Sequence, residues 1–359
     1  MKRNYQKFFP PGTQKGGSNK HFSLLEKLGW QPHFAQQISS DELIETPPVR
    51  VVEVHRSGLH VLGSAVDEVI PPRPDATVGD WLLLNREHMA SSRVLERKSL
   101  LKRRAPGTDR QVQLIAANIE TAFVVSSCNQ DFNVARLERY VALCFEAEID
   151  PVILLTKSDL ASDPRAYAAK AAEISQRVPV ITLDARASEP VSKLADWCKA
   201  GKTVAFLGSS GVGKSTLTNA LSGTGSIATQ AIREDDAKGR HTTTRRQLHL
   251  VPGGCLVLDT PGMRELQLTD AASGIEDLFA DISELARGCK FKDCRHETEP
   301  GCAVQAAIVS GDLDASRLQR WRKLKAEEAF NSASLAERRS KDKAFGKMVR
   351  RIMKAKENR

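Results

Sequence analysis

Short apolar runs separated by turn residues mark the chain from residue 49 to residue 84. Strands are expected at 49–55, 58–64 and 81–84, with glycine and proline between them. This rhythm is typical of a small barrel, and a five-stranded oligonucleotide-binding (OB) barrel fits the length of the segment. A basic run at 97–104 closes it.

After residue 108 the period of the apolar positions changes, and strands alternate with amphipathic helices. We expect strands at 121–126, 152–155, 178–183 and 204–207, and helices at 134–146, 164–177 and 191–199. Apolar strands connected by helices favour a mostly parallel sheet that is covered on both faces. The pattern after Ile275 is helical and includes a helix at 313–329.

The size and composition of the chain fit a globular protein of two or three domains. It has 359 residues, of which 41% are hydrophobic and 27% are charged. No apolar run approaches the roughly 18 residues that a membrane helix needs, and the polar start has no signal-peptide core. A cytoplasmic location without membrane contact is therefore expected.

A glycine-rich loop follows the strand expected at 204–207. It reads Gly208-Ser209-Ser210-Gly211-Val212-Gly213-Lys214-Ser215, and Thr216 follows it. Such a loop between a strand and a helix binds nucleotide phosphates, because its backbone N–H groups close around the oxygens and the helix N-terminus attracts the anion. Lys214 is expected to reach the β- and γ-phosphates and to assist catalysis, and the Ser215 hydroxyl is expected to bind Mg²⁺.

Two further motifs each follow an apolar strand. In Asp259-Thr260-Pro261-Gly262, Asp259 is expected to hold the Mg²⁺ shell and the Gly262 N–H to sense the γ-phosphate. In Thr156-Lys157-Ser158-Asp159, the carboxylate can accept two hydrogen bonds from guanine that adenine does not offer, while Lys157 packs along the base. Together with the phosphate loop, these motifs predict a site for GTP and GDP.

The order of the motifs is unusual. The base-reading motif at 156–159 comes about 50 residues before the phosphate loop at 208–215, whereas regulatory GTPases have the reverse order. The sequence therefore predicts a circular permutation, which a domain tolerates when its termini lie near each other at the surface. The chain leaving Gly262 then leads directly into the C-terminal region, which gives hydrolysis a route to move that region.

The segment Gly239-Arg240-His241-Thr242-Thr243-Thr244 is expected to supply a threonine for Mg²⁺ and the γ-phosphate. Thr243 is the first candidate and Thr242 the second. Met263 stands where many GTPases place a glutamine that orients the attacking water, and methionine cannot do so. Either another group holds the water, with His241 as the candidate, or a partner completes the site. The missing glutamine predicts slow basal hydrolysis that a partner stimulates.

Three of the seven cysteines form a cluster with a histidine: Cys289-x₄-Cys294-x-His296-x₅-Cys302. Three thiolates and one imidazole suit tetrahedral Zn²⁺ and leave no position open for catalysis. We interpret the cluster as a structural zinc site. The alternative is a set of unrelated reduced cysteines.

The positive charge of the chain is concentrated at its C-terminal end. The net charge is +9, and residues 287–359 hold 19 basic and 10 acidic side chains, so the remaining residues are neutral overall. A tail that carries the whole excess indicates a polyanion such as RNA. The alternative is a solvated basic helix that only keeps the protein soluble.

This combination of motifs resembles the circularly permuted, ribosome small-subunit-dependent GTPases of the RsgA (YjeQ) family. The resemblance runs from about Leu24 to Ala329 and includes Ala117-Asn118-Ile119 and Asn129-Gln130-Asp131-Phe132-Asn133. It implies a role in late maturation of the small ribosomal subunit, contact with its 16S rRNA, stimulation of GTP hydrolysis by that subunit, and His241 as the catalytic histidine. From the guanine-backing loop at 183–186, only Ala185 is carried over.

The resemblance also implies a multidomain α/β architecture. It comprises an OB-fold RNA-binding domain (48–108), a circularly permuted P-loop GTPase domain (109–274) and a helical zinc-binding domain with a basic tail (275–359). The proline- and glycine-rich start of the chain predicts a flexible N-terminal extension with a short helix at 1–47. GTP or GDP, Mg²⁺ and one structural Zn²⁺ are the expected ligands, and the chain is expected to act as a monomer.

Two other functions fit parts of the sequence. An RNA-binding zinc protein could hold GTP only as a structural ligand; intact Lys214, Ser215 and Asp259 argue against this, and Met263 argues for it. A GTPase of translation or signalling is the other alternative. The barrel, the zinc cluster and the basic tail argue against it, because all three suit rRNA.

Overall fold

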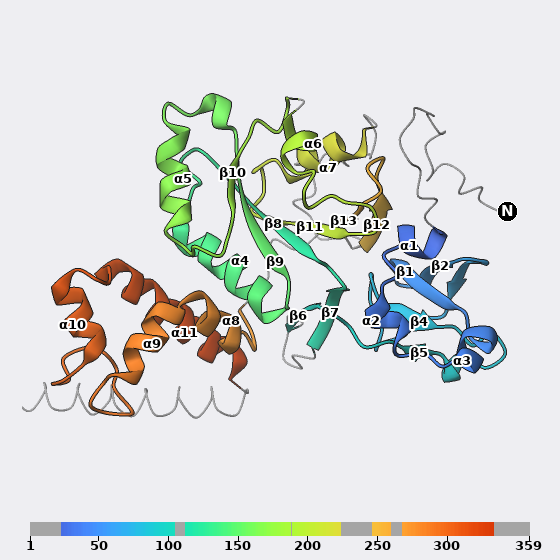
Figure 1. The fold of residues 1–359 in the computed structure, drawn as a ribbon, viewed down its shortest axis with the longest axis horizontal. Helices are drawn as coiled ribbons and strands as arrows, with labels where there is room; N and C mark the ends of the chain where they lie inside the picture. Colours follow the sequence, from blue (N-terminus) through green and yellow to red (C-terminus); the bar gives the residue numbers. More distant parts are fainter. Residues whose placement is uncertain (1–22, 105–111, 188, 224–245, 260–267, 334–359) are drawn as a thin grey trace, which may run out of the picture. The chain divides into compact units, whose positions relative to one another are not determined.

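The computed structural model describes residues 23–104, 112–187, 189–223, 246–259 and 268–333 (Figure 1). The chain divides into two compact units, one formed by residues 1–102 and 114–266 and the other by residues 103–113 and 267–359. The finer division into four domains stays a prediction.

The larger unit is built on one continuous sheet. Its strand order is β10-β9-β8-β11-β13-β12-β1-β2-β3, with β4 paired to β1 and β5 paired to β4. The strands are β1 (Pro48–His55), β2 (Gly58–Gly63), β3 (Val66–Ile70), β4 (Trp81–Leu83), β5 (Arg93–Val94), β8 (Thr121–Ser127), β9 (Asp150–Thr156), β10 (Val180–Thr182), β11 (Thr203–Gly208), β12 (Arg246–Leu250) and β13 (Leu256–Asp259).

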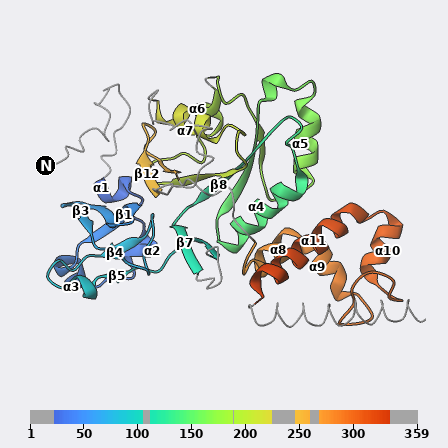
Figure 2. The same ribbon diagram turned by 180° about the vertical axis from the view of Figure 1, so that it is seen from behind.

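Helices cover both faces of the parallel part of this sheet, as the sequence predicts. Figures 1 and 2 show α4 (Val134–Glu146) and α5 (Pro164–Ala172) on one side, and α6 (Glu189–Lys193) with α7 (Lys214–Ser222) on the other. Helix α5 ends five residues earlier than expected. The side chain of Ser175 accepts a hydrogen bond from Arg177 N at 3.2 Å, which offers the backbone a turn in place of another helical bond.

The sheet departs from a purely parallel arrangement at β12. Strands β10, β9, β8, β11 and β13 are parallel, whereas β12 runs antiparallel to β13 and to β1. Strands β1, β2 and β3 therefore continue the same sheet through the β1–β12 pair, in which Glu53 lies opposite Gln247. The sequence gives little sign of β12, because Leu248 is its one buried residue.

The N-terminal part of the larger unit contains three short helices where the sequence predicts one. They are α1 (Leu24–Lys27), α2 (Pro32–Ala35) and α3 (Ser40–Glu45). Phe34 on α2 is buried and its ring lies 5.8 Å from that of Trp81 on β4, measured between centroids. The apolar side chains of β1 to β4 form a separate core.

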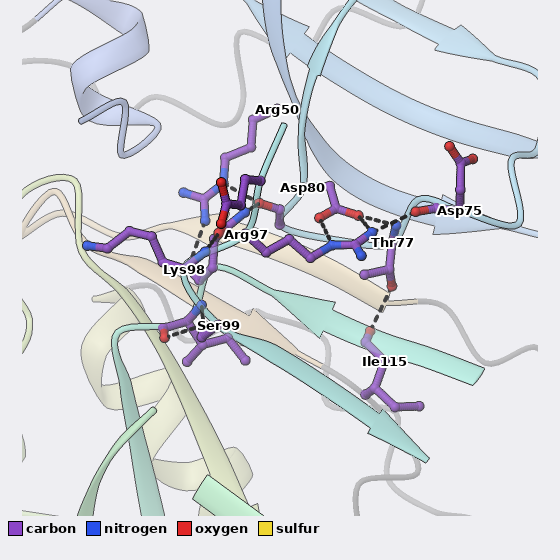
Figure 3. A network of polar contacts seen from close by, with 12 residues as sticks. Arg50, Asp75, Thr77, Asp80, Arg97, Lys98, Ser99 and Ile115 are labelled. Atoms are coloured by element: carbon purple, nitrogen blue, oxygen red, sulfur yellow. Dashed lines mark hydrogen bonds and ion pairs between the residues drawn. The ribbon is translucent and has the colours of Figure 1, made fainter. Parts of the chain in front are cut away.

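A buried arginine on β1 joins this region to the strand that precedes the phosphate loop (Figure 3). Arg50 is 1% exposed, and its guanidinium donates to the carbonyls of Leu28, Gly79 and Asn118 and to the hydroxyl of Thr203. The bond to Thr203 Oγ1, at the start of β11, is 2.8 Å long. Burial lowers the pKa of Arg50 to about 10, so the side chain remains charged at neutral pH.

An ion pair with a buried carboxylate lies beside Arg50. Both carboxylate oxygens of Asp80 accept from Arg97, at 2.7 and 2.9 Å, and one also accepts from Thr77 N at 2.7 Å (Figure 3). Burial raises the pKa of Asp80, and the hydrogen bonds from Arg97 oppose that shift. Lys98 Nζ donates to the side chain of Gln31 at 2.8 Å. Arg97 and Lys98 belong to the basic run of the sequence, but both make contacts within the protein.

We expect the substitution Arg50→Met to lower the free energy of unfolding by about 3–5 kcal/mol, because it leaves buried acceptors and nearby acidic groups without their cation. Urea denaturation followed by tryptophan fluorescence measures this, since Trp81 lies 5.8 Å from the Arg50 guanidinium. The matched control is Arg86→Met, whose exposed pair with Glu68 should contribute less than about 1 kcal/mol. Equal losses in the two variants would contradict the role given to Arg50.

The smaller unit is helical. It contains α8 (Ala272–Leu278), α9 (Ala280–Arg287), α10 (Ala303–Ser310) and α11 (Ala315–Ser332), and Arg317 on α11 makes a 2.7 Å ion pair with Asp281 on α9.

The strands β6 (Leu100–Arg104) and β7 (Val112–Ala117) form a two-stranded sheet of their own. None of the described helices combines the length and the apolar character that a bilayer crossing demands.

The basic tail falls largely outside the described residues. Residues 287–359 contain 19 basic and 10 acidic side chains. Of these, 9 basic and 7 acidic side chains lie at 287–333, and 10 basic and 3 acidic side chains lie at 334–359. The described helices therefore carry only a small part of the positive excess.

Candidate nucleotide and metal sites

The phosphate loop has the local structure that its sequence predicts, between β11 and α7. Gly208, Gly211 and Gly213 have φ angles of 144°, 75° and 100°, which side chains other than glycine rarely adopt. A Cβ added at Gly208 would also lie 2.3 Å from the carbonyl oxygen of Val125, so glycine is required there by space as well. At Gly211 an added Cβ would meet nothing within 4 Å, so the top of the loop is open to a ligand.

The ammonium group of Lys214 closes over the start of this loop. Its Nζ donates to the carbonyl oxygens of Gly208, at 2.7 Å, and of Ser209. These are acceptors that a phosphate oxygen can replace, so the side chain is already directed at the position of an anion. Ser215 and Thr216 are exposed on the first turn of α7, where the helix dipole favours negative charge.

The base-reading motif lies at the other end of the phosphate loop. Thr156 ends β9 and is fully buried, and its hydroxyl donates to the carbonyl oxygen of Val212 at 2.6 Å. A Cβ added at Gly213 would lie 3.6 Å from Thr156 Oγ1 and 3.7 Å from the Cβ of Ala185. Three segments that are distant in the sequence therefore meet at Gly213.

The rest of the base-reading motif continues from this contact. Lys157 has a φ of 56° and precedes a single 3₁₀ turn, Ser158–Leu160, on which Asp159 is exposed. The left-handed backbone at Lys157 turns the chain away from the sheet immediately after Thr156. Asp159 is thus available to a ligand above the carboxyl edge of the sheet.

Sheet topology explains why the permuted order does not disturb the site. Strands β9 and β11 flank β8 and run parallel to it, so their carboxyl ends reach the same edge. Ligands of open α/β sheets bind at this edge, whichever order the chain visits the strands in. Asp259 ends the neighbouring strand β13, at the same edge.

Several residues expected at the site lie outside the described residues. They are His241, Thr242, Thr243, Gly262 and Met263. For Asp259 the structure describes the backbone alone. Their roles in Mg²⁺ binding, γ-phosphate sensing and water positioning stay predictions.

One charged residue at the phosphate loop is not predicted from the sequence. Arg136, on the first turn of α4, donates from Nη1 to the hydroxyl of Ser209 at 2.9 Å. It belongs to no recognised nucleotide motif and lies 73 positions away from Ser209. Only the pairing of β8 with β11 brings the two residues together, so no local signal identifies this contact.

We expect the substitution Thr156→Val to weaken GDP binding by about tenfold, because the carbonyl oxygen of Val212 loses a buried hydrogen-bond donor inside the loop. Titration with a fluorescent GDP derivative measures the change. The control is Thr182→Val on the adjacent strand β10, opposite Leu155, which should leave the affinity unchanged. An unchanged affinity in Thr156→Val would show that this hydrogen bond does not shape the loop.

The cysteine and histidine side chains of the predicted zinc site converge. The ligand atoms of Cys289, Cys294, His296 and Cys302 all lie within 4.8 Å of one another. Nδ1 of His296 is 3.5 Å from the sulfurs of Cys289 and Cys302, and those two sulfurs are 3.8 Å apart. Around a tetrahedral Zn²⁺ ion, with Zn–S and Zn–N distances of about 2.3 and 2.1 Å, two sulfurs would lie ~3.8 Å apart, and a sulfur and a nitrogen ~3.6 Å apart. The residues present therefore fit Zn²⁺.

Hydrogen bonds hold the cluster in this arrangement. Gln305 and Arg322 both donate to the carbonyl oxygen of His296, and Lys290 N donates to Gly301 O at 3.0 Å to close the loop. Burial lowers the pKa of His296, and the nearby Arg322 lowers it further. A neutral imidazole is the form that binds a metal ion.

Comparison with known proteins gives consistent relatives over almost the full chain. A family model described as RsgA GTPase matches residues 94–269. The chain is 48% identical over 339 residues to the small ribosomal subunit biogenesis GTPase RsgA 2 of Vibrio parahaemolyticus, covering 93% of this chain and 94% of that protein. It is 51% identical over 316 residues to the small ribosomal subunit biogenesis GTPase RsgA of Mesorhizobium japonicum, covering 86% of this chain and 91% of that protein.

Two solved structures share the fold. YjeQ from Thermotoga maritima superposes with a TM-score of 0.55 and 25% identity, covering 77% of this chain and 96% of that one. YloQ, described as a circularly permuted GTPase, gives a TM-score of 0.54 and 27% identity, covering 80% of this chain and 96% of that one. The permuted motif order, the strand topology and the identity over more than nine-tenths of the chain agree: this chain belongs to the RsgA family of circularly permuted GTPases.

Proposed function

We propose that this GTPase acts on the small ribosomal subunit during its late maturation, where it hydrolyses GTP to GDP and phosphate. Binding to the subunit and its 16S rRNA stimulates hydrolysis, and hydrolysis is coupled to release. The names of the relatives from Vibrio parahaemolyticus and Mesorhizobium japonicum, as small ribosomal subunit biogenesis GTPases, support the choice of partner.

The observation that supports the nucleotide assignment best is the meeting of Thr156 and Ala185 at Gly213 of the phosphate loop. This contact supports the proposal that the segment at 156–159 reads guanine next to a loop that binds phosphates. In the proposed site, Asp159 accepts from guanine, Lys157 and Ala185 border the base, and the loop N–H groups at 208–213 bind phosphates.

The proposed catalytic residues surround the terminal phosphates. Lys214 neutralises the β- and γ-phosphate oxygens, and Ser215 with Asp259 and Thr243 holds Mg²⁺, which neutralises charge that develops on the oxygens during transfer. Gly262 senses the γ-phosphate, and His241 positions the attacking water. Thr216 continues the first turn of α7 beside the bound phosphates.

The proposed zinc unit holds one structural Zn²⁺ at Cys289, Cys294, His296 and Cys302. It presents α11 and the basic segment at 334–359 to rRNA, in keeping with the charge distribution along the chain. When such a segment binds RNA, it releases counterions that are condensed on the phosphates, and this release is less favourable at high salt. The affinity for RNA therefore falls as the salt concentration rises. We propose that the protein works as a cytoplasmic monomer.

Co-sedimentation with purified ribosomal subunits tests this proposal. The protein should pellet with small subunits in the presence of a non-hydrolysable GTP analogue, and much less with GDP or with large subunits. Raising the salt concentration from 50 to 200 mM should reduce binding by a factor of about 10 or more. Equal binding to both subunits in every nucleotide state would refute the choice of partner.

A further inference from the structure

The first turn of α4 is fixed next to the phosphate loop. Asn133 caps the helix, and its side chain accepts from Arg136 N at 3.0 Å. In the preceding turn, Asn129 Oδ1 accepts from Ser127 Oγ at 2.8 Å and from Asp131 N at 3.0 Å. Because β8 ends at Ser127 and pairs with β11, this turn and the loop leave the same edge of the sheet.

The two ends of the phosphate loop have different surroundings. Gly213 lies at the base-reading end, beside Thr156 and Ala185. Ser209 lies at the opposite end, where its carbonyl accepts from the ammonium of Lys214. Since the lysine of such a loop serves the β- and γ-phosphates, Ser209 marks the end that receives the terminal phosphates.

Arg136 places a second cation at that end. Its Nη1 is 2.9 Å from Ser209 Oγ, and within the part of the chain that the structure describes this hydroxyl is the one acceptor found for the guanidinium. The side chain is exposed, and a guanidinium carries five N–H donors. Most of its donors therefore face solvent next to the place where phosphate oxygens are expected.

We propose that Arg136 is a specificity-determining residue that favours the triphosphate over the diphosphate, a proposal that rests on the nucleotide site proposed above. GTP carries one more phosphate group than GDP, and the additional negative charge lies at the end of the loop that Arg136 borders. A cation held there attracts the triphosphate more strongly than the diphosphate. Ser209 keeps the guanidinium in place before the nucleotide arrives.

The test compares binding of a non-hydrolysable GTP analogue and of GDP to the full-length protein. In Arg136→Gln the affinity for the analogue should fall about tenfold and that for GDP no more than about threefold, the range expected for a charge that the bound nucleotide partly covers. Arg136→Lys keeps the charge and should retain most of the preference. Raising the ionic strength should reduce the preference of the wild type more than that of Arg136→Gln.

The control is Arg165→Gln. Arg165 is exposed on the first turn of α5, which leaves the same edge of the sheet after β9, and its substitution should change neither affinity. An equal loss for both nucleotides in Arg136→Gln, or no loss for either, would overturn the inference while leaving the nucleotide site in place. A wild type that binds neither nucleotide would instead refute the site itself.

Discussion

Replacing Lys214 with alanine should reduce kcat/KM for GTP by about two to three orders of magnitude, the effect of removing one preorganised donor from a charge-stabilising site. The structure gives the reason. The ammonium already contacts the carbonyls of Gly208 and Ser209, so it is positioned at the start of the loop before any nucleotide binds. Without it, the charge on the terminal phosphates is not compensated in the transition state. Single-turnover hydrolysis of radiolabelled GTP measures the loss.

The matched control for this experiment is Lys199→Ala. Lys199 is exposed and precedes β11, at the opposite end of the strand from the phosphate loop. This variant should hydrolyse GTP at the wild-type rate. Loss of activity in both variants, or in neither, would contradict the role given to Lys214.

The second large effect is expected at the metal cluster. Cys289→Ala should lower the zinc content from about one ion per chain to none and should unfold the segment between α9 and α10. Structural zinc in small domains contributes about 10–16 kcal/mol of binding free energy at neutral pH, which the short helices there cannot replace. Elemental analysis of the purified protein and limited proteolysis measure the two changes.

The control for the metal experiment is Cys144→Ala. Cys144 is fully buried on α4, and burial raises the pKa of its thiol, so it stays neutral and binds no metal ion. That variant should retain its zinc. Retention of one zinc per chain in Cys289→Ala would show that the four converging side chains are not its ligands.

The sequence predicts the local elements of the GTPase region because each of them has a strong pattern. The strands β8, β9 and β11 are buried along nearly their whole length and read as continuous apolar runs. The phosphate loop is recognisable for a related reason, since its glycines at positive φ admit few other residues. The spacing of the three cysteines and the histidine likewise predicts a cluster that the structure confirms as spatially close.

What the sequence does not predict are contacts between distant segments. The hydroxyl of Thr156 reaches Val212, 56 positions away, and Arg50 reaches Thr203, 153 positions away. Neither contact has a periodic signature, because each follows from strand order and not from local spacing. A basic run also looks the same in sequence whether it faces RNA or, like Arg97, pairs with a buried carboxylate.

GTP hydrolysis by the purified protein, with and without ribosomal subunits, tests the proposed function directly. Small subunits should raise the turnover rate by at least about tenfold, as partners that complete a GTPase site do, and large subunits should not. The Lys214→Ala variant should show no stimulation. Tight GTP binding without turnover under any of these conditions would contradict the proposed function and leave a nucleotide-binding protein that does not hydrolyse GTP.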